Sequence, residues 1–205
     1  MALLQTQPRF DVESYLAWEE TQPERHEYFA GEVFAMSGGT DAHYTITLNV
    51  AANLKRALAG TPCRPFVSGM KVRIATADAD AILYPDVFVT CDVRDKTPEA
   101  ALAKGHPLLI VEVLSDSTAA YDRGRKFELY QQIAELQEYL IIEQDRAHAD
   151  LFRKNAEGLW VLHPIAADGT ITLQSVNLSL PLAGAYVDVD LPAQGAASFA
   201  PGAGI

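Results

Sequence analysis

The sequence predicts an α/β or α+β fold in which helices flank a mixed β-sheet. Segments with helical spacing of apolar residues alternate with short apolar runs that are typical of strands. The chain has 205 residues, 49% of them hydrophobic and 9% aromatic, which is enough to bury one sizeable core. The end of the chain beyond Leu180 is rich in Gly, Ala and Pro. We therefore predict a single domain over residues 1–185, followed by a tail at 186–205.

The N-terminal part of the chain is predicted to form a helix, a hairpin and a second helix. Residues 10–20 place apolar side chains at roughly helical spacing. The next segment alternates around Gly31, which predicts a hairpin with strands at 26–29 and 32–36. A longer helix is expected over 43–60, because a Gly-Gly-Thr-Asp sequence precedes it and a glycine ends it.

The rest of the chain is dominated by strands, with one more helix. The apolar segment 82–90 is predicted to be a single strand. Residues 91–107 are rich in charge, Pro and Gly, so we expect a mobile surface connection there, and a helix with one apolar side at 119–136. The remaining strands are predicted from apolar runs and hairpin spacing at 63–69, 70–74, 108–114, 138–144, 148–154 and 159–165.

Charge and cysteine content narrow the function classes. The chain has 16 Lys and Arg against 27 Asp and Glu, a net charge of −11, which disfavours general attraction to nucleic acid or anionic membranes. A phosphate site would therefore need concentrated positive charge or a metal. Cys63 and Cys91 form no CxxC or zinc spacing, so we expect both to be reduced. Without a leader pattern or a long apolar run, the expected compartment is the cytoplasm.

Two apolar strands each contain a single acid, Asp86 in ILYPDVFV and Glu112 in LLIVEVL. An unpaired buried carboxylate costs several kcal/mol, so it must be protonated, paired or bound to a cation. If the two strands lie side by side, a cation between the acids relieves their repulsion. With the backbone carbonyl of Val113 and waters, the acids would form a Mg²⁺ or Mn²⁺ site. The alternative is a strand-end glutamate whose head group reaches water.

The predicted helix after the second strand carries polar residues on one face. Asp122, Lys126 and Tyr130 are spaced i, i+4 and i+8, so they share a side of the helix. If that side faces the strand end, Lys126 would reach the carboxylate pair. An ammonium there can orient or deprotonate a metal-bound water and hold a phosphate oxygen. The alternative is an exposed lysine paired with Asp122 or Glu128.

Taken together, these motifs resemble the Uma-two family, bacterial proteins with a restriction-endonuclease-like fold in the PD-(D/E)xK nuclease superfamily. The resemblance is carried by YPD at 84–86, VEVLSDST at 111–118 and YDRGRKF at 121–127, and it extends from about Val12 to Arg153. It implies a restriction-endonuclease-like core with an N-terminal helix and hairpin. The strands expected after this core form additional C-terminal hairpins.

The resemblance also assigns roles to the acids and the lysine. It implies that Asp86 is the motif aspartate and Glu112 the acidic residue of the (D/E)xK element. The sequence departs from the superfamily pattern at Leu114, which stands where the motif has lysine. Lys126 resembles the migrated replacement that reaches in from the following helix. A displaced lysine also fits a degenerate enzyme on the same fold.

Further polar residues are candidates for accessory roles. Glu32 in the predicted hairpin either lies near the site or is solvated at the surface. His43 at the start of the long helix either contacts a phosphate or carboxylate or only caps the helix. Ser117 lies in a Ser/Thr-rich stretch that either caps the following helix or binds phosphate at its N-terminus. Asp122 and Tyr130 are candidates because they share the side of Lys126.

Three functions remain open from the sequence. The first is a metal-dependent DNA endonuclease that hydrolyses phosphodiester bonds, with Asp86 and Glu112 holding Mg²⁺ or Mn²⁺ and Lys126 positioning the attacking water. The second is a catalytically degenerate binding or assembly module, forming a homodimer through its sheet, which the acidic charge balance favours. The third is a small-molecule or nucleotide hydrolase, for which residues 91–107 would be the expected cover of the site.

Overall fold

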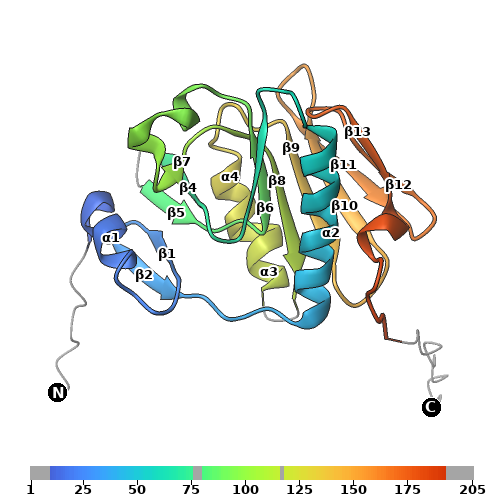
Figure 1. Ribbon diagram of the computed structural model, residues 1–205, viewed down its shortest axis with the longest axis horizontal. Coiled ribbons are helices and arrows are strands. Elements are labelled where there is room, and N and C mark those ends of the chain that lie inside the picture. Colours follow the sequence, from blue (N-terminus) through green and yellow to red (C-terminus); the bar gives the residue numbers. More distant parts are fainter. Residues whose placement is uncertain (1–9, 76–79, 116–117, 193–205) are drawn as a thin grey trace, which may run out of the picture.

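A computed structural model describes residues 10–75, 80–115 and 118–192 of the chain. Two β-sheets and helices packed against them form the body, and a two-stranded hairpin lies toward the C-terminal end (Figure 1). The predicted α/β architecture of a mixed sheet flanked by helices is confirmed. The N-terminal helix and hairpin and the additional C-terminal hairpin strands are also present.

The larger sheet has six strands in the order β11-β10-β9-β8-β6-β3. Its central strand β8 (Pro107–Leu114) is buried along its whole length, as its apolar sequence predicts. Strand β8 pairs antiparallel with β6 (Val87–Thr90) and parallel with β9 (Glu138–Glu143). The outer strands are β3 (Arg64–Val67), β10 (Ala149–Lys154) and β11 (Trp160–Ile165).

The smaller sheet has the order β2-β1-β5-β4-β7 and lies under the N-terminal helix α1 (Val12–Glu19). The hairpin turns at Ala30 and Gly31, whose φ angles of 51° and 92° suit the tight turn between antiparallel strands. The strands are β1 (His26–Phe29), β2 (Glu32–Ala35), β4 (Lys71–Ala75), β5 (Asp80–Leu83) and β7 (Ala103–Lys104).

The segment 82–90 is not the single strand that we expected. Its first part belongs to β5 in the smaller sheet and its last part to β6 in the larger sheet. Between them the residues from Tyr84 to Asp86 leave the strand pairing, since Pro85 has no N–H to donate to a ladder. The chain therefore passes from one sheet to the other at the predicted motif aspartate.

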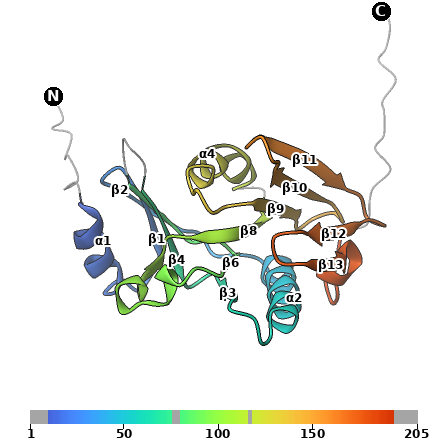
Figure 2. The ribbon, with the colours of Figure 1, turned by 90° about the horizontal axis from the view of Figure 1, so that it is seen from above.

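Helices cover both faces of the larger sheet (Figure 2). One face carries α2 (Asp41–Ala57) together with the hairpin β12 (Thr170–Leu173) and β13 (Leu178–Pro181). The other face carries α4 (Phe127–Tyr130). Along β8, Val111 and Val113 pack with the α2 side, whereas Ile110 and Leu114 pack with the α4 side. Side chains along a strand point alternately to the two faces of the sheet, so Glu112, which lies between Val111 and Val113, points toward the α4 side.

The helix that we expected over 119–136 is shorter and irregular. It consists of α3 (Ala119–Tyr121), a π-helical turn, η3 (Asp122–Lys126), and α4, which ends at Tyr130. Insertions of π-helical turns widen a helix locally and are frequent at functional sites.

The connection at 91–107 is more ordered than its composition predicts. It contains two short 3₁₀ helices, η1 (Arg94–Lys96) and η2 (Pro98–Ala100), and strand β7. Asp95 is only 3% exposed and accepts hydrogen bonds from several donors of this segment. A further 3₁₀ helix, η4 (Leu182–Ala185), follows β13.

The expectation of two reduced cysteines is wrong, because Cys63 and Cys91 form a disulfide. Strands β3 and β6 pair antiparallel with Arg64 opposite Thr90, so the next pair along the ladder is Cys63 opposite Cys91. Sequence spacing alone does not reveal which strands pair, so the disulfide could not be predicted from it. The cytoplasmic location stays a prediction.

Two observations concern the ends and surface of the molecule. In the described part of the chain, no helix combines the length and the apolar character needed to cross a membrane. Of the expected tail at 186–205, Tyr186 is buried against the core, and Val189 and Leu191 pack beside it. Residues 193–205 lie outside the described part.

Candidate active site

The structure brings Asp86, which directly precedes β6, together with Glu112 of the neighbouring strand β8. Val87 pairs with Val111 in the antiparallel ladder of β6 and β8, so the preceding Asp86 lies opposite Glu112. The backbone N–H of Asp86 donates to Glu112 Oε2 at 3.1 Å. Both acids are buried, with 9% and 2% of their surfaces exposed. The bend at Pro85 and the strand register thus create a buried pair of acids.

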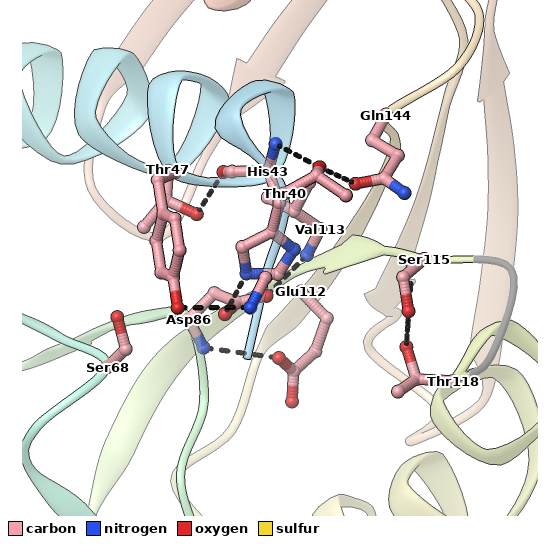
Figure 3. A network of polar contacts seen from close by, with 12 residues as sticks. Thr40, His43, Thr47, Ser68, Asp86, Glu112, Val113, Ser115, Thr118 and Gln144 are labelled. Atoms are coloured by element: carbon pink, nitrogen blue, oxygen red, sulfur yellow. Dashed lines mark hydrogen bonds and ion pairs between the residues drawn. The ribbon is translucent and has the colours of Figure 1, made fainter. Parts of the chain in front are cut away.

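The Asp86 carboxylate is held by two donors (Figure 3). Its Oδ2 accepts from the backbone N–H of Val113 at 2.8 Å, and its Oδ1 lies 2.9 Å from His43 Nε2. His43 stands in the first turn of α2, where Thr40 is the N-cap and accepts from the His43 N–H at 3.2 Å. Gly39 permits close packing there, since a Cβ on it would come within 2.7 Å of the His43 ring.

Lys126 approaches the acids from the π-helical turn. Its Nζ lies 3.2 Å from Glu112 Oε1, 3.1 Å from Asp122 Oδ1 and 3.3 Å from Glu27 Oε1. The contact with Asp122 is an ion pair without hydrogen-bond geometry. Tyr130, one turn further along, donates its hydroxyl to Glu112 Oε1 at 2.8 Å. The predicted shared side of Asp122, Lys126 and Tyr130 therefore faces Glu112.

Negative charge exceeds positive charge in this cluster. Four carboxylates, from Glu27, Asp86, Glu112 and Asp122, surround one lysine and one histidine. Burial raises the pKa of Glu112 well above its ordinary value, and the charges of Asp86 and Asp122 raise it further against the opposing effect of the lysine. A cation placed between the acids would relieve this repulsion.

The carboxylates of the cluster raise the pKa of both of its basic groups. Burial lowers the pKa of Lys126, but the carboxylates of Glu112, Glu27 and Asp122 outweigh this and raise it well above the ordinary lysine value. Burial likewise lowers the pKa of His43, but the hydrogen bond and charge of Asp86 raise it overall. His43 Nδ1 is buried and has no hydrogen-bond partner among the described residues.

One side of an open cleft of about 410 Å³ is lined by members of this cluster, namely His43, Asp86, Glu112, Asp122 and Lys126. Its other walls come from the segments before β1 and after β2, including Arg25 and Ser37. Among the described residues that line it, none belongs to 91–107, so the expected cover is replaced by these N-terminal segments. Asp86 and Lys126 therefore both form part of the wall of this cleft.

One of the expected accessory residues does not join the cluster. Glu32 is exposed at the turn end of the outer strand β2 and does not line the cleft. Ser117 lies outside the described residues. Glu27, which was not among the predicted site residues, occupies the position beside Lys126, because it belongs to the inner strand β1. An acid flanked by aromatic and histidine residues in a short strand was the available signal for Glu27.

A second acidic group lies at the hairpin between β9 and β10. Ligand atoms of Glu143, His148 and Asp150 all lie within 4.8 Å of one another. However, Arg123 contacts both acids, at 2.9 Å from Glu143 Oε1, and Arg146 also pairs with Glu143. Because two guanidinium groups already neutralise these acids, the group is a surface ion-pair network, unlike the cluster around Lys126.

Comparisons with known proteins agree with this fold. Two uncharacterized proteins of a Synechocystis strain are 40% and 32% identical to the chain, over 84% and 79% of its length and 88% and 90% of their own. A crystal structure from Anabaena variabilis, described as "a putative nuclease belonging to DUF820", superposes with a TM-score of 0.66 at 16% identity. That similarity covers 84% of this chain and 97% of the other.

The family comparison covers nearly all of the described chain. A family model with the description "Putative restriction endonuclease" matches residues 12–183. This range includes Asp86 before β6, the strand that carries Glu112 and the turn that carries Lys126. The chain therefore belongs to the Uma2 (Uma-two) family of restriction-endonuclease-like proteins.

Proposed function

We propose that the chain is a metal-dependent endonuclease that hydrolyses phosphodiester bonds in DNA, with Asp86, Glu112 and Lys126 as its catalytic residues. Family membership and the fold support a nuclease-type hydrolase. The observation that carries the proposal is the buried excess of carboxylates around a single lysine, at the edge of an open cleft. Buried acids in such number require a cation or protons to be stable.

The residues present fit a divalent ion. Asp86 Oδ1 and Oδ2 each accept one hydrogen bond, so each keeps a lone pair, and Glu112 offers a second hard oxygen ligand. Asp86 and Glu112, with the backbone carbonyl of Val113, would hold Mg²⁺ or Mn²⁺. When bound, such an ion supplies Lewis-acid polarisation of a phosphate oxygen and lowers the pKa of water.

The protein groups around the acids would bind and orient the substrate. Lys126, kept charged by three carboxylates, would hold a phosphate oxygen as negative charge develops on it during attack by water. His43, whose Nε2 lies 2.9 Å from Asp86 Oδ1, would keep that carboxylate in position. Tyr130 and Asp122 are positioning residues, because they contact Glu112 and Lys126.

A plasmid-cleavage assay tests the catalytic proposal. Supercoiled DNA is incubated with the protein and Mg²⁺ or Mn²⁺, and with EDTA as the metal-free control. We expect nicking that falls by on the order of a hundredfold or more in Asp86→Asn, because a metal ligand is lost. Asp145→Asn, at an exposed turn residue, is the matched control and should keep full activity. Equal cleavage by wild type and Asp86→Asn would assign the activity to a contaminant.

The second candidate is a binding or assembly module that has lost catalysis. It is favoured by one observation: three carboxylates of the chain itself already engage Lys126. Calorimetric titration with Mn²⁺ separates the two functions. Metal uptake that disappears in Glu112→Gln supports the endonuclease, whereas no uptake at millimolar concentration, together with no cleavage, supports the module.

A further inference from the structure

An apolar hollow lies directly beside the carboxylate cleft. It has a volume of about 460 Å³ and is lined by residues of the β1–β2 hairpin and of the helical segment after β8. The hollow and the cleft share Met36, Ser37, Thr118 and Lys126. Lys126 thus lies between the cleft and the hollow, where it contacts Glu112 and the Tyr121 ring. A ligand with a phosphate in the cleft would have its neighbouring groups at the mouth of this hollow.

Aromatic rings from two separate elements face the hollow. Phe29 and Phe34 come from the hairpin, and Tyr121 comes from α3. Phe34 is 48% exposed and Tyr121 is 37% exposed, although both are large and mostly apolar. Large exposed aromatic side chains that gather in one hollow mark a binding surface more often than a packing defect.

A guanidinium group adds one more planar side chain to the aromatic rings that line the hollow. The Arg125 guanidinium lies 4.4 Å from the centroid of the Phe29 ring. Its ion pair with Glu128, at 3.1 Å, joins two largely exposed side chains and is therefore weak. Arginine planes and aromatic rings are the groups on which proteins stack unpaired bases, and the arginine adds attraction to phosphate.

We propose that this hollow holds one unpaired nucleobase of the DNA strand whose phosphate occupies the cleft, so that the enzyme acts on single-stranded or locally unpaired DNA. The inference rests on the proposed nuclease function and adds a substrate class to it. A base inside a duplex is already stacked, and turning it outward costs a few kcal/mol. With a net charge of −11, the chain gains little from general phosphate attraction, so stacking supplies a larger share of the affinity.

Fluorescence of 2-aminopurine tests the proposal. A single-stranded oligonucleotide containing this base is titrated with the Glu112→Gln variant, which prevents cleavage, and the same sequence is titrated as a duplex. We expect quenching with the single strand and weak binding of the duplex. In the Glu112→Gln background, Phe34→Ala should weaken single-strand binding about tenfold, the loss expected for one stacked base. Phe34→Trp should restore it, and Leu48→Ala, at an exposed residue of α2, should change nothing.

The outcomes separate this inference from the nuclease proposal. Cleavage by the wild-type chain with Mn²⁺ is measured on both substrates in parallel. Cleavage that is equal on both and unaffected by Phe34→Ala overturns the nucleobase site and leaves the nuclease standing. No cleavage, but quenching that depends on Phe34, supports the nucleobase site without the nuclease. A change of sedimentation behaviour in Phe34→Ala, without any change in quenching, assigns the hollow to a contact between two copies and overturns the proposal.

Discussion

Two buried acidic groups in this molecule are stabilised in opposite ways. Asp95, in the connection between β6 and β7, accepts from Thr90 Oγ1 at 2.6 Å, from the Gly105 N–H at 2.8 Å, and from both the backbone N–H and the ring of His106. Burial raises the pKa of Asp95, but these donors outweigh it and hold the pKa below the ordinary value. Glu112, by contrast, has other carboxylates among its neighbours, and its pKa is raised.

The difference separates an acid that stabilises the fold from acids arranged for a ligand. The donors around Asp95 satisfy one charge completely with groups of the protein itself, so the segment 91–107 is ordered around it. Around Glu112 the protein supplies more negative charge than it neutralises. Such an excess is maintained at sites that bind a cation or tune protonation.

Removal of Lys126 is the strongest way to test this comparison. Lys126→Met leaves Glu112, Asp122 and Glu27 without their shared cation inside a buried site. We expect a loss of about 3–5 kcal/mol in the free energy of unfolding, measured by urea denaturation with EDTA present. Added Mn²⁺ should recover part of this loss, because a divalent ion replaces the missing positive charge.

Lys55→Met provides the matched control, because Lys55 is exposed on α2 and the same atoms are removed. We expect its free energy of unfolding to change by less than about 0.5 kcal/mol. If Lys126→Met changes the free energy of unfolding as little as this control, the cluster does not depend on its lysine for stability. The contrast with Asp95 would then be wrong.

The fold class could be predicted because it depends on local patterns. The apolar run of β8, the hairpin around Gly31 and the long helix starting at the Gly-Gly-Thr-Asp sequence are all visible in short windows. The disulfide and the division of 82–90 between two sheets depend on which strands pair over long distances. A single sequence carries no direct signal for that pairing.

The candidate site, too, could be predicted only where it depends on local patterns. One acid in each of two apolar strands indicated that Asp86 and Glu112 would meet, and helical spacing indicated the side of Lys126. Glu32 was predicted as an accessory residue and Glu27 was not, although both acids lie in the hairpin. Only the position of β1 inside the sheet, between β2 and β5, brings Glu27 to the lysine.

A smaller effect is expected at the other acidic group. Asp95→Asn replaces an acceptor-only carboxylate by an amide whose NH₂ would face N–H donors of Gly105 and His106. The loss should be about 1–3 kcal/mol, and it should not respond to Mn²⁺. Urea denaturation with and without the metal measures both points, with Asp145→Asn as the exposed control. A metal-dependent loss at Asp95 would contradict its assignment as a structural acid.

The smallest expected effect is a pH dependence of the stability that Asp95 contributes. Because folding lowers its pKa from the ordinary value of 3.8, ionised Asp95 stabilises the fold above that value. The contribution is lost as the pH falls through the lowered pKa of the folded state. Asparagine does not titrate, so the stability difference between wild type and Asp95→Asn should shrink as the pH falls below the ordinary carboxyl pKa of 3.8. Denaturation curves at several pH values below about 5 check this, and a difference that grows as the pH falls over that range would mean that the donors around Asp95 do not favour its ionised form.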